Sequence, residues 1–165
     1  MVPVFRLTVF LALTTSVFAG GPLAALVKAA EGFAAAIQQQ IAAVQSITSA
    51  TELAEKTIAY ADAKISYYKA LRAAMPELTK IATGQEPRPQ EVDKFRDAFR
   101  VSGEIQEIAA DKETAALLER FSGDPEVQKA AAEFDHAQKL EETFLKDFEG
   151  QDFTSRRFTM SPRRV

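Results

Sequence analysis

The sequence predicts an all-α protein, built as an antiparallel bundle of about four long amphipathic helices. Alanine is abundant, and the 7 glycines and 7 prolines lie mainly between stretches of helical periodicity. No window shows the sustained period-two alternation that is typical of strands. The 165 residues suffice for one domain with a single core, and they include no cysteine. Packing rather than disulfides must therefore stabilise the fold.

The first 19 residues match a secretory signal peptide. Arg6 supplies a positive charge, an apolar segment follows over 7–19, and small residues fit cleavage after Ala19. We therefore predict an extracytoplasmic protein, either secreted or periplasmic. The alternative is an uncleaved anchor that continues into 23–27 and makes the protein a membrane-anchored helical stalk.

Residues 20–150 form the predicted bundle domain, whose first half keeps one heptad frame from 23 to 75. A single long helix, and hence a long coiled-coil hairpin, is compatible with that frame. However, Ser49 and Glu52 fit a capping box within a run of poor helix formers. We therefore predict two helices, over 23–49 and 51–75.

Two prolines mark the middle of the chain. Pro76 is expected to end or kink the second helix, with a short turn or helix over 77–82. The segment 83–90, TGQEPRPQ, is the main predicted break, since the residues before its prolines are disfavoured in helices. Helices are predicted over 91–110 and 112–121, either separate or as one bent helix.

The segment SGDPE at 122–126 is the sharpest predicted boundary. Gly123 suits the end of a helix, Asp124 suits an N-cap and Pro125 suits the first helical position. The last helix should then run from Pro125 to about Glu149.

Apolar stripes on these helices are predicted to form the core, or an interface if the chain self-associates. The residues that we select on the stripes are Ile37, Val44, Ile58, Ile65, Phe134, Phe144 and Phe148. Lys64 and Glu141 fall on the apolar sides of their helices and are a candidate buried ion pair. Alternatively, both side chains lie at the edge of the stripe and extend to water.

The search for chemical motifs gives one candidate metal pair, Glu133 and His136. Their Glu-x-x-His spacing occurs in di-iron bundles, but such sites need two of these motifs and this chain has one histidine. His136 also faces away from the stripe that contains Phe134. We therefore expect no metal, no other cofactor and no enzymatic activity. The acidic residues of 104–107, with Asp93 and Asp97, are expected to lie on solvent-exposed helix faces.

The charge is unevenly distributed along the chain. All 23 acidic residues lie within 20–153, whereas five of the 20 basic residues lie outside it, which leaves that segment with a net charge of −8. The outlying basic residues are Arg6 and the four arginines of the C-terminal tail, Arg156, Arg157, Arg163 and Arg164. An acidic body argues against nucleic-acid binding. The tail, 151–165, is predicted to be disordered and could contact an anionic surface.

These observations predict a non-enzymatic protein that acts by binding an unidentified protein partner or by self-association. The alternative is an amphipathic bundle that binds lipid or another apolar ligand.

Overall fold

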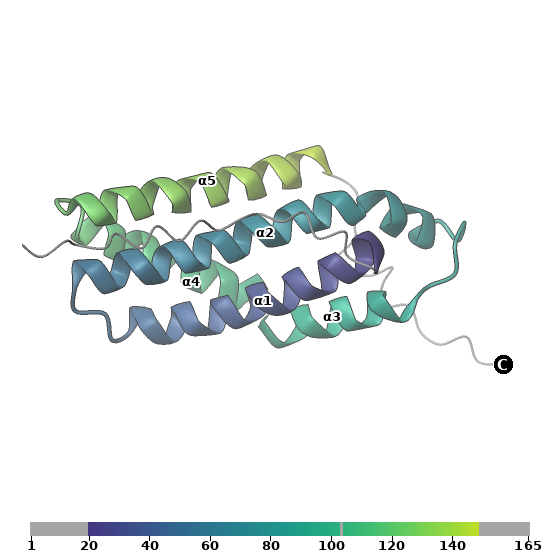
Figure 1. The fold of residues 1–165 in the computed structure, drawn as a ribbon, viewed down its shortest axis with the longest axis horizontal. Helices are drawn as coiled ribbons and strands as arrows, with labels where there is room; N and C mark the ends of the chain where they lie inside the picture. Colours follow the sequence, from purple (N-terminus) through teal and green to yellow (C-terminus); the bar gives the residue numbers. More distant parts are fainter. Residues whose placement is uncertain (1–19, 103, 149–165) are drawn as a thin grey trace, which may run out of the picture.

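The computed structural model describes residues 20–148 apart from Gly103. Within this part of the chain all regular structure is helical, which confirms the all-α prediction (Figure 1). The five helices are α1 (Gly21–Val44), α2 (Ala50–Ala82), α3 (Gln90–Ser102), α4 (Glu104–Arg120) and α5 (Pro125–Asp147). The predicted signal peptide and basic tail lie outside the described residues.

The helices form a four-rod bundle in which α3 and α4 follow one another along one rod (Figure 1). Each rod reverses the direction of the rod before it, as predicted for an antiparallel bundle. In space, however, α1 packs beside α3 and α4, and α2 packs beside α5. The neighbours α2 and α5 run parallel, since Tyr60 contacts Phe134 and Tyr68, two turns later, contacts Phe144. Figure 1 shows that α1 likewise runs in the same direction as α3 and α4.

The loop after Val44 separates α1 from α2, as the capping box predicts. Ser49 is the N-cap of α2, and its side chain accepts a hydrogen bond of 3.3 Å from the backbone N–H of Glu52. The heptad frame continues across the loop because both helices face one core. The single long helix, and with it the coiled-coil hairpin, is wrong.

Pro76 was predicted to end or kink the second helix, and it does not end α2. The helix continues to Ala82, and Met75 and Leu78 on either side of the proline are buried. Core packing of these side chains offsets the loss of one backbone hydrogen bond. The helix ends instead before Gly84, which adopts a positive φ of 74°.

No helix boundary lies at Asp111 within the third rod. The segments 91–110 and 112–121 were expected to be separate helices or one bent helix, and α4 runs through Asp111, which excludes separate helices that meet there. Asp111 is held in the bundle by hydrogen bonds from Tyr60 and Lys64 of α2.

The start of α5 is the predicted one. The side chain of Asp124 accepts hydrogen bonds from the backbone N–H groups of Glu126, at 2.9 Å, and Val127, at 3.3 Å, and Pro125 occupies the first turn. The helix ends at Asp147, two residues before the predicted end.

The predicted apolar stripes lie in the core of one chain rather than on an open face. Ile37, Ile65, Phe134 and Phe144 are buried, and the remaining three, Val44, Ile58 and Phe148, are partly buried. Aromatic rings fill the middle of the bundle around Phe33, which contacts the rings of Tyr60, Tyr67 and Tyr68. Among the described helices, none combines the length and apolarity that a membrane-crossing segment needs.

Candidate functional site

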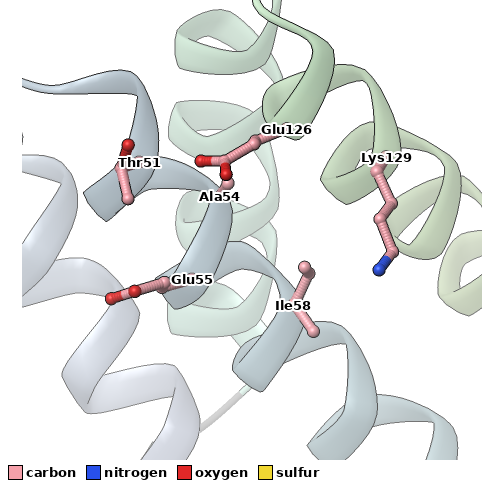
Figure 2. Close-up of a pocket in the computed structure, with 6 residues that line it drawn as sticks. All are labelled: Thr51, Ala54, Glu55, Ile58, Glu126 and Lys129. Atoms are coloured by element: carbon pink, nitrogen blue, oxygen red, sulfur yellow. The ribbon is translucent and has the colours of Figure 1, made fainter. Parts of the chain in front are cut away.

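A hollow lies between the first turns of α2 and α5, at one end of the bundle (Figure 2). Its volume is about 290 Å³. Thr51, Ala54, Glu55 and Ile58 line it from α2, and Glu126 and Lys129 line it from α5. Three of these six side chains are charged and exposed. An open hollow with a charged rim does not resemble the enclosed, mainly apolar sites that hold small molecules.

The principal group of polar side chains lies inside the bundle and is built on helical spacing. Tyr60, Lys64 and Tyr68 are four residues apart on α2, and therefore share one face of that helix. Glu107 and Asp111 have the same spacing on α4. We call these five residues, together with Glu141 of α5, the Lys64 cluster.

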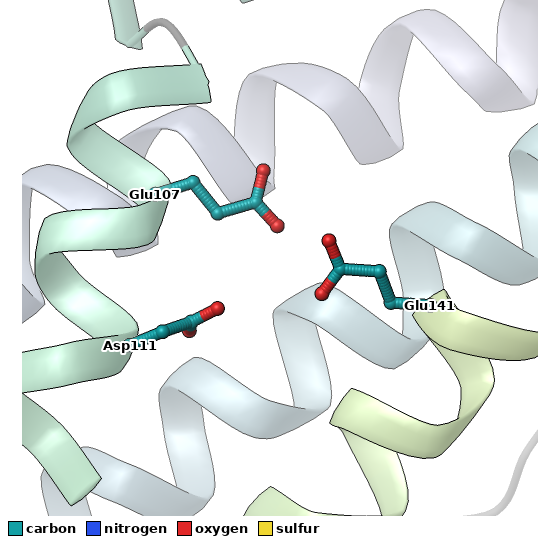
Figure 3. A group of neighbouring side chains, drawn as sticks. All are labelled: Glu107, Asp111 and Glu141. Atoms are coloured by element: carbon teal, nitrogen blue, oxygen red, sulfur yellow. The ribbon is translucent and has the colours of Figure 1, made fainter. Parts of the chain in front are cut away.

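The ammonium group of Lys64 lies among three carboxylates. Its Nζ atom is 2.7 Å from Asp111 Oδ2, 3.2 Å from Glu107 Oε1 and 2.5 Å from Glu141 Oε2. Figure 3 shows these carboxylates directed toward one another from α4 and α5. The Lys64 side chain has no exposed surface, that of Glu107 is 6% exposed, and those of Asp111 and Glu141 are about one fifth exposed.

Hydroxyl and amide groups complete the cluster. Tyr60 Oη donates a hydrogen bond of 2.7 Å to Asp111 Oδ1, and Tyr68 Oη donates one of 3.4 Å to Glu107 Oε1. Lys64 Nζ also lies 3.4 Å from the amide oxygen of Gln138. The buried charges are therefore satisfied by several partners, as burial of an ion pair requires.

Burial and charge act in opposite directions on the titration of the cluster. Burial raises the pKa of Glu107 to about 7, and the neighbouring Lys64 ammonium opposes that increase. Burial by itself would lower the pKa of Lys64, but Asp111 and Glu107 outweigh it and hold that pKa above the ordinary value. Burial also raises the pKa of Tyr60 and Tyr68, so both phenols stay protonated.

The arrangement is suited to holding helices together rather than to catalysis. Oxygen atoms of the three carboxylates lie within 4.8 Å of one another, a spacing that could surround a metal ion. The Lys64 ammonium already contacts all three carboxylates and supplies the cation of the cluster. A charged ammonium with three acidic partners is also a poor nucleophile.

The structure brings together the two residues that the sequence singled out as a candidate pair, Lys64 and Glu141. Sequence reasoning missed their partners on α4. Glu107 was expected on a solvent-exposed face, but it is buried. The prediction placed a possible helix boundary at Asp111, so the four-residue spacing of Glu107 and Asp111 on one helix was overlooked. The sequence did contain a signal for these partners, because Glu107 and Asp111 are four residues apart, as are Tyr60 and Lys64.

The candidate metal pair lies elsewhere on α5. His136 is exposed and Glu133 is partly buried, and neither belongs to the Lys64 cluster. The tail arginines, like the rest of the tail, lie outside the described residues.

Comparison with known proteins adds no relative. No family model matches the chain, and no curated protein or solved structure is significantly similar to it.

Proposed function

We propose that this chain is a non-enzymatic helical bundle that acts through protein–protein interaction, in the form of self-association. The observation that carries the proposal is the position of Ile108 and Leu145. Their exposed fractions are 60% and 57%, and they are the exposed large apolar side chains among the described residues. Isolated apolar side chains are common on protein surfaces, but Ile108 and Leu145 share one location, and apolar side chains that share a location are typical of a binding surface.

Both residues border the line where α4 faces α5. Ile108 is about 60° around α4 from Asp111, on the side away from Glu107, and Leu145 lies one turn beyond Glu141 on α5. Asp111 and Glu141 both belong to the Lys64 cluster between the two helices. We call the outer edges of α4 and α5 along this line the α4–α5 seam.

The charges along the seam favour a second copy as the partner. Lys112 is exposed one turn after Ile108, and Glu142 is exposed three residues before Leu145. In a two-fold dimer the same surface of each chain meets its counterpart. Lys112 of one copy could then face Glu142 of the other, beside the two apolar side chains.

The closed state of the Lys64 cluster supports a binding role over an enzymatic one. Lys64 has no exposed surface, and the hollow of Figure 2 is lined by other residues. Lipid binding has less support, because the aromatic side chains of the core pack against one another and would become available only if the bundle opened. An extracytoplasmic location, with cleavage after Ala19, remains part of the proposal and is supported by the sequence of residues 1–19.

Self-association can be tested by light scattering over a range of protein concentrations. We expect the mass of the wild-type chain to rise toward that of a dimer with concentration. The double variant Ile108→Glu with Leu145→Glu should remain monomeric, because it places negative charge on the apolar part of the seam.

The matched control carries the same two charges at exposed positions farther from the seam. Ala109 lies about 100° around α4 from Ile108, on the side away from Asp111, and Thr143 lies about 160° around α5 from Leu145. The double variant Ala109→Glu with Thr143→Glu should therefore associate like the wild type. A monomeric wild type at every concentration, or equal association of both variants, would contradict the proposal.

A further inference from the structure

The Lys64 cluster contains more acidic than basic groups. Three carboxylates surround one ammonium, so the fully ionised cluster carries a net charge of −2. Glu107 is the most deeply buried of the three carboxylates. An unbalanced charge in such a position is costly, and one bound proton would reduce it.

The cluster also spans a wide separation between α4 and the α2–α5 pair. The backbone of α4 runs close to α1 but remains farther from α2 and α5. The long side chains of Lys64, Glu107 and Glu141 extend across this space and meet within it. Attachment of α4 to the α2–α5 pair therefore depends strongly on polar contacts, whose strength varies with ionisation.

We propose that the Lys64 cluster is a pH-sensitive clasp, which holds α4 against α2 and α5 while it retains a proton and loosens when all three carboxylates are ionised. Loosening would occur at the α4–α5 seam. By contrast, the hydrogen bond between Gln40 and Thr114, which joins α1 to α4, has no titratable partner.

Glu107 is the group that the clasp depends on, and charged or titratable side chains face it from three helices. These are Lys64, Tyr60, Tyr67 and Tyr68 from α2, Asp111 from α4 and Glu141 from α5. On α1 the titratable residues Lys28 and Glu31 are exposed. The tyrosines stay protonated and Lys64 stays charged near neutral pH, which leaves Glu107 to respond.

The sign follows from the pKa of Glu107, which burial raises from 4.5 to about 7. A carboxyl whose pKa is higher in the folded state makes folding more favourable at low pH. That contribution is lost as pH rises from about 4.5 to about 7, and little further change follows above it. The clasp is therefore expected to be closed at pH 5.5 and loosened at pH 8.

Hydrogen–deuterium exchange of the full chain at pH 5.5 and pH 8, corrected for the intrinsic effect of pH, tests the proposal. Protection of amides in α4 should fall by about 30-fold between pH 5.5 and pH 8, because the closed state loses about tenfold in relative population per pH unit up to a pKa of about 7 and little above it. Amides of α1 and α2 should change much less. Constant protection in α4, or equal loss in all helices, would overturn the proposal.

The Glu107→Gln variant removes the titrating group but keeps a polar side chain of similar size. Protection of α4 should then be the same at both pH values, whereas Glu113→Gln, an exposed change on the same helix, should retain the wild-type response. His136→Gln should also retain it, because this exposed histidine lies outside the Lys64 cluster. A wild-type response in Glu107→Gln would overturn the proposal.

A measurement on the wild type covers the case in which Glu107→Gln does not fold. Carbon-13 NMR of the glutamate carboxyl groups should show one that titrates with a midpoint near 7, and the resonances of α4 should shift over the same range. Titration of every glutamate near its ordinary value would overturn the proposal.

Discussion

Lys64 illustrates how a single residue can be charged and yet fully buried. Lys64 lies one turn from Tyr60 and one turn from Tyr68 on α2, and its ammonium contacts oxygen atoms from two other helices. Attraction to the carboxylates offsets the cost of removing that charge from water. The residue therefore specifies the relative positions of α2, α4 and α5.

Replacement of Lys64 by alanine should lower the free energy of unfolding at neutral pH by about 3–5 kcal/mol, because three carboxylates would then lack their cation. Urea denaturation followed by circular dichroism measures this change. Lys56→Ala, an exposed lysine on the same helix, is the control and should alter stability by less than about 0.5 kcal/mol. Similar effects of the two substitutions would show that the cluster does not stabilise the fold.

The Lys64–Glu141 pair was predictable because both residues fall on apolar stripes that helical periodicity defines. The contacts of Lys64 with Glu107 and Asp111 were not predictable in this way. Whether Glu107 and Asp111 face the core depends on how α4 rotates against α1, and that rotation is set by packing across the bundle rather than by the pattern within α4.

At the scale of the elements, capping residues predict where a helix starts more strongly than Pro76 predicts where one ends. Side chains at Ser49 and Asp124 satisfy backbone N–H groups that a helix start leaves without partners, so these two starts are fixed by a few residues. Pro76 is a weaker signal, since α2 continues through it with buried side chains on both sides.

Asp124→Ala should destabilise the protein by about 1 kcal/mol, because α5 would lose the acceptor for two of its first N–H groups. The denaturation midpoint in urea reports this loss. Asp62→Ala is a suitable comparison, since Asp62 is exposed in the middle of α2, where alanine is the better helix former. If Asp124→Ala and Asp62→Ala gave equal stability, the cap would contribute nothing.

At the scale of the whole molecule, one core connects all four rods. The parallel neighbours α2 and α5 share the aromatic contacts of Tyr60 with Phe134 and of Tyr68 with Phe144. The long connection after α2 makes this arrangement possible, because it lets the chain cross the end of the bundle before α3 begins.

A shared core predicts cooperative unfolding at pH 5.5, where the clasp is closed. The chain has three tyrosines and no tryptophan, and all three tyrosines are buried. Near-ultraviolet circular dichroism therefore reports the core, and the far-ultraviolet signal reports the helices. The two urea transitions should coincide; separate midpoints would indicate that some helices unfold independently of the core.

By itself, the sequence determined the helical class, the break before Ser49, the start of α5 and most of the core stripes. Each of these depends on residues close together in the chain, through periodicity, capping and backbone preference. The tertiary structure alone decided the parallel pairing of α2 with α5 and the meeting of Lys64 with Glu107, Asp111 and Glu141. Those features depend on the distance and rotation between helices, which arise when side chains that are far apart in sequence compete for one interior.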